Sequence, residues 1–136
     1  MQKLFSTLLC VLLICFSFSA VGADEEAVVD DYAYFGFEPD IITNYISDGN
    51  KVGFVRITME IMVKSPDHIE IIEHHAPLIR ATVVEILGEQ TEIKVKSASG
   101  KFEIREKCLN AINKLLKEET GKELAERLLF TKYIYH

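Results

Sequence analysis

Tryptophan is absent from the sequence, and proline and cysteine occur only three times each in 136 residues. Two of the three cysteines, Cys10 and Cys15, lie in an apolar N-terminal segment, which leaves Cys108 alone in the rest of the chain. A single cysteine cannot form an internal disulfide, so the folded part must be stabilised by packing. No internal repeat or low-complexity tract is present. The composition, with 49% hydrophobic and 26% charged residues, is typical of one globular domain.

Basic residues are also scarce, with 15 Lys and Arg against 21 Asp and Glu, giving a net charge of −6. Such a surface repels phosphate backbones, which excludes nucleic acid as an expected partner. The segment Ser99–Lys101 has the S-G-K letters that end a phosphate-binding loop. It lacks the upstream glycine and the Ser or Thr after the lysine, so we interpret it as a chance match.

The N-terminus has the layout of a secretory signal. Lys3 precedes the uncharged stretch Leu4–Gly22, and the small residues Val21 and Ala23 stand three and one before an expected cleavage point. The same 19 uncharged residues are about the minimum that spans a bilayer as an uncleaved anchor. We therefore expect residues 1–23 to be a signal peptide or an N-terminal membrane anchor.

Beyond that segment we expect an acidic leader over residues 24–33 and one folded domain over residues 34–136. Cleavage would leave 14 basic against 21 acidic residues, because Lys3 is the only charge removed. The domain is long enough for a modest hydrophobic core.

The clearest strand pattern runs from Phe54 to Lys64, where apolar residues alternate with mostly polar ones. The aromatic and β-branched segment Tyr34–Ile46 before it predicts an irregular extended stretch, interrupted by Pro39. A turn at Asp48–Asn50 joins the two segments, so we expect an antiparallel hairpin.

Ser65 and Pro66 are a hydroxyl cap and a first-turn proline, which predict a helix start. The run from Pro77 to Leu87 is apolar over too much of a helical circumference for a one-sided surface helix, so we expect it to be largely buried. Pro77 either kinks one continuous helix or begins a second one. Gly88 is the expected stop.

The last third of the chain predicts a short strand or extended connection at Ile93–Lys96, then an amphipathic helix from Lys101 that ends at Gly121 or continues over residues 122–127. The final residues 128–136 are rich in β-branched and aromatic types, which favour a strand beside the hairpin. The expected fold is α+β, with a small antiparallel sheet of hairpin plus C-terminal strand packed against two or three helices.

Residue chemistry predicts neither a catalytic site nor a cofactor. His68, His74 and His75 invite a metal hypothesis, but adjacent histidines on a helix point about 100° apart, and ligands of one metal usually lie three or four residues apart. Cys108 lies on the apolar row of a predicted helix, where a thiol behaves as a small buried hydrophobe. We expect no enzyme and no bound metal, and keep a free periplasmic binding module, metal-linked through these histidines, as the alternative function.

Arg80 is the one charge inside the buried run. Either its stem packs while its head reaches the surface or pairs with a carboxylate such as Glu73 or Glu38, or it anchors an interface.

Five stretches in order make the chain resemble the FliL family of flagellar basal-body-associated proteins. They cover nearly all of the expected domain, and each is unspecific when taken alone. The stretches are F-G-F-E-P-D-I-I-T-N at 35–44, F-V-R-I-T-M-E-I at 54–61, H-A-P-L-I-R at 75–80, G-K-F-E-I-R-E-K at 100–107 and F-T-K-Y-I at 130–134.

The resemblance implies a periplasmic domain similar to the stomatin-type fold, which forms homo-oligomers, contacts flagellar stator and basal-body proteins, and supports motility. Family members are typically anchored in the inner membrane, which this chain would share only if residues 1–23 are retained. The resemblance also suggests family-motif or interface residues on the matched stretches: Glu38, His75, Pro77, Arg80 and Gly100.

Overall fold

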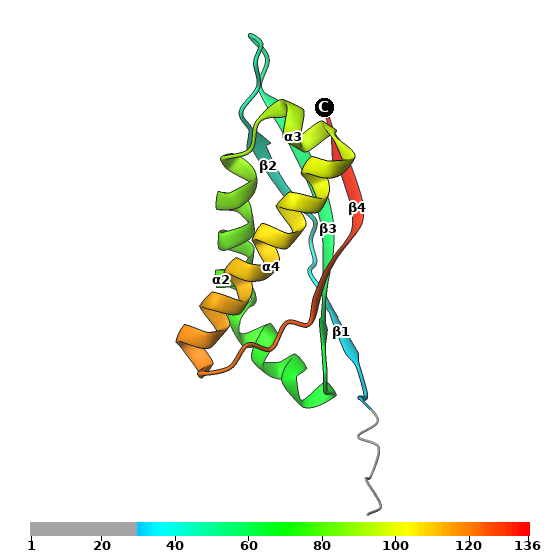
Figure 1. Ribbon diagram of the computed structural model, residues 1–136, viewed down its shortest axis with the longest axis vertical. Helices are drawn as coiled ribbons and strands as arrows, with labels where there is room; N and C mark the ends of the chain where they lie inside the picture. Colours follow the sequence, from blue (N-terminus) through cyan, green and yellow to red (C-terminus); the bar gives the residue numbers. More distant parts are fainter. Residues whose placement is uncertain (1–29) are drawn as a thin grey trace, which may run out of the picture.

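The computed structural model describes residues 30–136, so the expected signal or anchor and most of the acidic leader lie outside the described residues. The described chain folds into one antiparallel sheet covered on one face by helices (Figure 1). This confirms the predicted α+β class. Among residues 30–136 there is no helix with the length and hydropathy needed to cross a membrane.

Strand β3, Gly53–Val63, is the centre of the sheet because every other strand pairs with it. Strands β1, Ala33–Gly36, and β2, Ile41–Tyr45, pair with its two halves, and β4, Arg127–Tyr135, pairs along nearly its whole length. The predicted alternation of β3 is confirmed, since its odd-numbered residues from Val55 to Val63 are fully buried. The predicted hairpin is the β2–β3 pair.

The segment expected to be one irregular stretch is two strands with a bend between them. Phe37 is buried and its backbone N–H donates to the Met59 carbonyl at 3.0 Å, after which the chain turns at Pro39. The Glu38–Pro39 peptide bond is cis. A proline at this point costs the sheet nothing, because it falls where β1 has ended and β2 has not begun.

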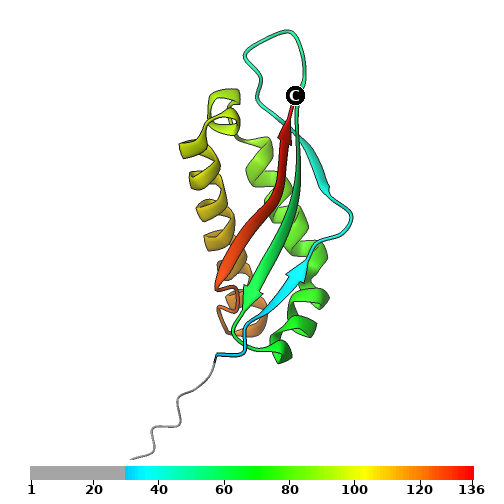
Figure 2. The same ribbon diagram turned by 90° about the vertical axis from the view of Figure 1, so that its right-hand side faces the viewer.

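Two long helices, α2 (Ile69–Gly88) and α4 (Ala98–Thr120), lie side by side on one face of the sheet, and Figure 2 shows that the other face carries no helix. The short helix η1, Pro66–His68, precedes α2, and its cap is the predicted one: the Ser65 hydroxyl accepts from the Asp67 N–H at 3.3 Å. Helix α4 ends at Gly121 in the left-handed region, with φ of 80°. The extra turn considered for residues 122–127 does not form.

Helix α2 is continuous through Pro77. The proline lies in the interior of the helix and does not begin a second helix. The expectation of a largely buried run is correct on one face only. Ile79 and Val83 are fully buried, whereas Leu78 is 47% exposed. The helix ends at Gly88 as predicted, and its C-cap is Glu89 in the right-handed region.

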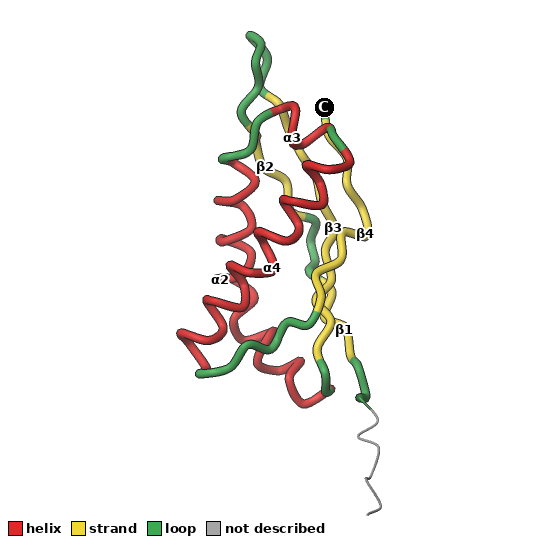
Figure 3. Tube along the Cα trace, viewed as in Figure 1, coloured by secondary structure: helices red, strands yellow, loops and turns green. Residues whose placement is uncertain are grey.

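The prediction of a short strand or extended connection at residues 93–96 is wrong. Helix α3, Glu92–Lys96, occupies this segment, visible as a separate short helix in Figure 3. The Thr91 side chain caps its first turn and Ser97 caps α4 in the same way, accepting from the Gly100 N–H at 3.0 Å. Helix α4 therefore begins at Ala98, three residues before the predicted Lys101.

The core lies between the sheet and the two long helices. Its fully buried large side chains come from every layer: Phe37, Val55, Ile57, Met59, Ile61, Val63, Ile72, Ile79, Leu87, Ile104, Ile112 and Leu116. This continuous cluster contains no paired cysteine, as the single-thiol argument requires.

Candidate functional site

Four of the five stretches that carry the family resemblance meet at the bend between β1 and β2. We define the bend site as Glu38, Pro39 and Asp40 together with the side chains that contact them: Arg56, Thr58, Arg80 and Lys132. Arg56 and Thr58 come from β3, Lys132 from β4 and Arg80 from α2. Residues more than 90 positions apart in sequence therefore share one surface.

Asp40 is the hub of the bend site. Its Oδ1 accepts from the Thr58 hydroxyl at 2.7 Å, and its Oδ2 accepts from Arg56 Nε at 2.6 Å and from Lys132 Nζ at 3.4 Å. The side chain is only 14% exposed, while those of Arg56 and Lys132 are about half exposed. The carboxylate thus ties β2 to β3 and to β4.

These donors hold the pKa of Asp40 at about 2, below its usual value of 3.8, chiefly through the Thr58 hydroxyl and next through Arg56. A carboxyl with such a pKa remains ionised near neutral pH and cannot exchange a proton as a general acid or base. Asp40 is therefore a fixed structural anion, and the bend site presents two partly exposed cations around it.

Replacing Asp40 by Asn is expected to flatten the acid limb of the stability profile. A carboxyl whose pKa is lowered by folding stabilises the domain above pH of about 4, and that stabilisation is lost as pH falls toward about 2. The melting temperature of the wild-type chain should fall more steeply over this interval than that of Asp40→Asn. Thermal melts at a series of pH values test this, with Asp48→Asn in the exposed hairpin turn as the control; parallel curves would contradict it.

Arg80 reaches the bend from the helix side, where its Nη1 donates to the Pro39 carbonyl at 2.8 Å. The ion pairs within residues 30–136 include none for Arg80, so the carboxylate partners considered for it, Glu73 and Glu38, do not hold it. Its acceptor is instead the carbonyl of the residue that follows Glu38. Glu38 itself is exposed beside it.

His75 and Pro77 lie on α2, one to two turns before Arg80. His75 Nδ1 is 2.8 Å from the Ile71 carbonyl, and its ring packs against His74 with centroids 5.0 Å apart. His74 and His75 line a cavity of about 450 Å³ at the α2–α4 end of the domain, together with Glu119. Pro77 is exposed.

The metal hypothesis gains no support from this arrangement. Within residues 30–136, no three side chains of His, Cys, Asp or Glu are close enough to share an ion. Nδ1 of His68 is buried without a hydrogen-bond partner. The three histidines therefore do not converge on one point.

Cys108 is fully buried on the inner face of α4, and burial raises the pKa of its thiol to about 12. A thiol with this pKa is almost entirely protonated at neutral pH, which disfavours it as a nucleophile or a metal ligand. Its predicted role as a core residue is confirmed by its burial.

Gly100 belongs to a different part of the fold, at the α3–α4 corner. It is buried, and a Cβ placed on it would overlap the Lys94 carbonyl oxygen and lie 2.6 Å from the Ser97 hydroxyl. Only glycine allows α4 to pass this close to α3. Gly100 is thus a packing residue.

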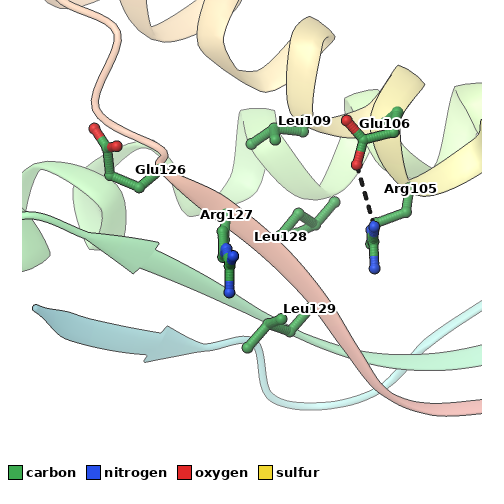
Figure 4. Close-up of a pocket in the computed structure, with 7 residues that line it drawn as sticks. All are labelled: Arg105, Glu106, Leu109, Glu126, Arg127, Leu128 and Leu129. Atoms are coloured by element: carbon green, nitrogen blue, oxygen red, sulfur yellow. Dashed lines mark hydrogen bonds and ion pairs between the residues drawn. The ribbon is translucent and has the colours of Figure 1, made fainter. Parts of the chain in front are cut away.

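A second surface was not predicted from the sequence: a groove between α4 and β4 (Figure 4). Two adjoining cavities of about 440 and 250 Å³, which share Arg105 and Leu129, form it. We call this the α4–β4 groove, and its principal lining residues are Lys101, Phe102, Arg105, Arg127, Leu129 and Phe130. The spacing of Lys101 and Arg105 on one helix face beside Phe102 was the sequence signal for it.

The fold and the bend site define a small α+β domain in which an ion-paired bend joins the strands of the sheet. Residues 34–135 match the model of the family described as "Flagellar basal body-associated protein FliL". The chain belongs to this family, which confirms the resemblance drawn from the five stretches. The search of curated proteins returned no match for the chain.

Proposed function

We propose that this protein acts in the periplasm as a homo-oligomer that supports or stabilises the stator of the flagellar motor. The family match over residues 34–135 carries the proposal. It places the chain among flagellar basal-body-associated proteins, and assembly with the stator is the role that the resemblance implies.

The surface of the domain supports a role in assembly. The sheet face without helices exposes large apolar side chains, with Tyr34 54%, Ile42 60%, Phe54 45% and Ile134 42% exposed. Apolar side chains gathered on one face favour contact with another protein. The bend site lies on this same sheet, and its Arg56 and Lys132 add positive charge beside the apolar residues.

Deleting the gene and tracking swimming cells in media of increasing viscosity tests the function. Loss of stator support should lower swimming speed most under high load, and the wild-type gene supplied in trans should restore it. Unchanged motility at every viscosity, with no second copy of the gene in the genome, would refute the proposal.

Replacing Arg80 by Ala is expected to weaken assembly more than folding. The change removes one hydrogen bond to the Pro39 carbonyl, which costs about 1 kcal/mol of unfolding free energy. It also frees the bend and removes a positive charge from the surface. Sedimentation should show a smaller oligomer fraction, while the melting temperature falls by only about 4 to 8 °C.

The matched control for Arg80 is Lys114→Ala, which removes an exposed cation from α4. Lys114→Ala should assemble like the wild type. If Arg80→Ala also assembles like the wild type, the role of Arg80 is confined to holding the bend.

A further inference from the structure

We propose that the α4–β4 groove binds residues 24–31, the acidic part of the leader, of a neighbouring copy of this chain. This inference deepens the proposed function, because it rests on homo-oligomer formation and assigns a contact that would produce it.

The groove lies beside a free strand edge. In the described part of the chain β4 pairs only with β3, so its other edge has no partner strand. An unpaired edge offers backbone N–H and C=O groups to an extended segment. A bulge opposite Thr58 and Met59 divides this edge into two regular stretches, of which Arg127–Phe130 is the first. That stretch borders the groove.

The groove has a cation at each end. Arg127 lies at one end and Lys101 at the other, and Leu129, Phe102 and Phe130 lie between them together with Arg105, where the two cavities meet. Arg105 stacks on Phe102 and the Lys101 ammonium lies 5.0 Å from the Tyr133 ring centroid.

Two carboxylates also line the groove, and each has a cation of its own. Glu106 pairs with Arg105 at 3.3 Å, and Glu126 pairs with Lys64 at 3.6 Å. Arg127 and Lys101 form no ion pair among residues 30–136. The uncompensated charge of the groove is therefore positive, although the whole chain is acidic.

The leader has the complementary order. Its sequence is D-E-E-A-V-V-D-D, which places Ala27, Val28 and Val29 between two acidic ends. In extended conformation eight residues span at most about 28 Å, enough to lay the apolar centre on Phe102 and Phe130 while both ends meet cations. The pattern is nearly symmetrical, so it fits the groove in either direction.

The leader cannot make this contact within its own subunit. Ala33, the first residue of β1, pairs with Val63 at the end of β3, and Phe130 pairs with Met59, four residues or about 13 Å further into the sheet. Asp30 lies outside that end of the sheet. Val28 is two residues from Asp30, at most about 7 Å, so the apolar centre of the leader stops short of its own groove.

A leader in the groove of the next subunit is a heterologous contact, which closes into a ring or continues as a filament. Each subunit then uses one groove and offers one leader.

Cysteine cross-linking in full-length chains tests the pairing. One chain carries Val28→Cys and a differently tagged chain carries Phe102→Cys, both with Cys10→Ser and Cys15→Ser; Cys108 stays because it is fully buried. Mild oxidation of the mixture should give a disulfide-linked heterodimer. The matched control replaces Phe102→Cys by Leu78→Cys, an exposed position on α2, and should give none.

Charge-reversal variants provide the second part of the cross-linking test. Lys101→Glu with Arg127→Glu should lower the heterodimer yield by about tenfold, as expected for losing two exposed ion pairs. Changing Asp30 and Asp31 to Lys in the partner chain should restore it.

Three results would overturn the proposal. They are no heterodimer from chains that still sediment as oligomers, a yield insensitive to the groove charges, or an equal yield from the Leu78→Cys control. The first leaves the proposed function standing. Failure of the proposed function itself would show instead as a monomeric wild-type chain and normal motility of the deletion strain.

Discussion

Val83→Asp is expected to unfold the domain. Val83 is fully buried on the face of α2 that meets the sheet, and none of the groups around it in the core carries a compensating charge. Burying an unpaired carboxylate and losing the packing of a valine should cost about 4 to 5 kcal/mol of unfolding free energy. A domain of this size has about 5 to 15 kcal/mol in total, so little or no stability would remain.

Circular dichroism during thermal and urea unfolding measures the effect. Leu78→Asp is the matched control, since it introduces the same charge into the same helix at a side chain that is 47% exposed. The control should melt close to the wild type. A Val83→Asp chain that is soluble and unfolds at the wild-type urea concentration would show that this face of α2 is not core.

The second large effect is expected from Gly100→Ala, although the change adds only one methyl group. The new Cβ would overlap the Lys94 carbonyl oxygen, a backbone atom that cannot rotate away as a side chain can. The α3–α4 corner would have to open, with a loss of about 2 to 3 kcal/mol in unfolding free energy. The loss occurs even though alanine is the better helix former.

Gly88→Ala separates the steric effect from helix propensity. Gly88 is also helical, but its added Cβ would lie 3.9 Å from the Asn44 carbonyl oxygen, which is ordinary contact. We expect Gly88→Ala to match or slightly exceed the wild type in unfolding free energy, because alanine favours a helix by up to about 1 kcal/mol over glycine. Equal melting temperatures for the two variants would mean that the α3–α4 corner yields readily.

The sequence correctly predicted those elements in which the pattern of apolar residues matches the side chains that are buried in the fold. The alternation of β3 follows from one buried and one open sheet face, and Ser65 with Pro66 begins the helical segment as propensity indicates. Helix α3 was missed because the apolar residues Ile93 and Val95 alternate like a strand, yet Ile93 is 73% exposed. The caps at each end of this short segment decided its conformation.

Pro77 shows tertiary packing overriding a local rule. A proline inside a helix costs about 3 kcal/mol. Pro77 is exposed, however, and Ile72 and Ile79 on either side of it are both fully buried against the sheet. A break at Pro77 would withdraw one of them from the core, so the helix continues.

The bend site could be predicted only as separate stretches. No local sequence pattern predicts that Asp40 contacts Thr58, Arg56 and Lys132. These contacts depend on the register of three strands and on the bulge that shifts β4 by one residue. The α4–β4 groove could not be predicted for the same reason. Its walls come from segments about 25 residues apart in sequence, which only tertiary packing brings together.

The central place of β3 has a consequence for the order of folding. Its partners β1 and β2 are close to it in sequence and are synthesised just before it. Strand β4 is synthesised only after both long helices, so Met62 of β3 cannot pair with Arg127 until then. Until then one edge of the most apolar strand is open to other nascent chains. A stalled or truncated product ending within α4 would therefore be a template for aggregation, and rapid packing of α2 onto β3 is the protection available to it during that interval.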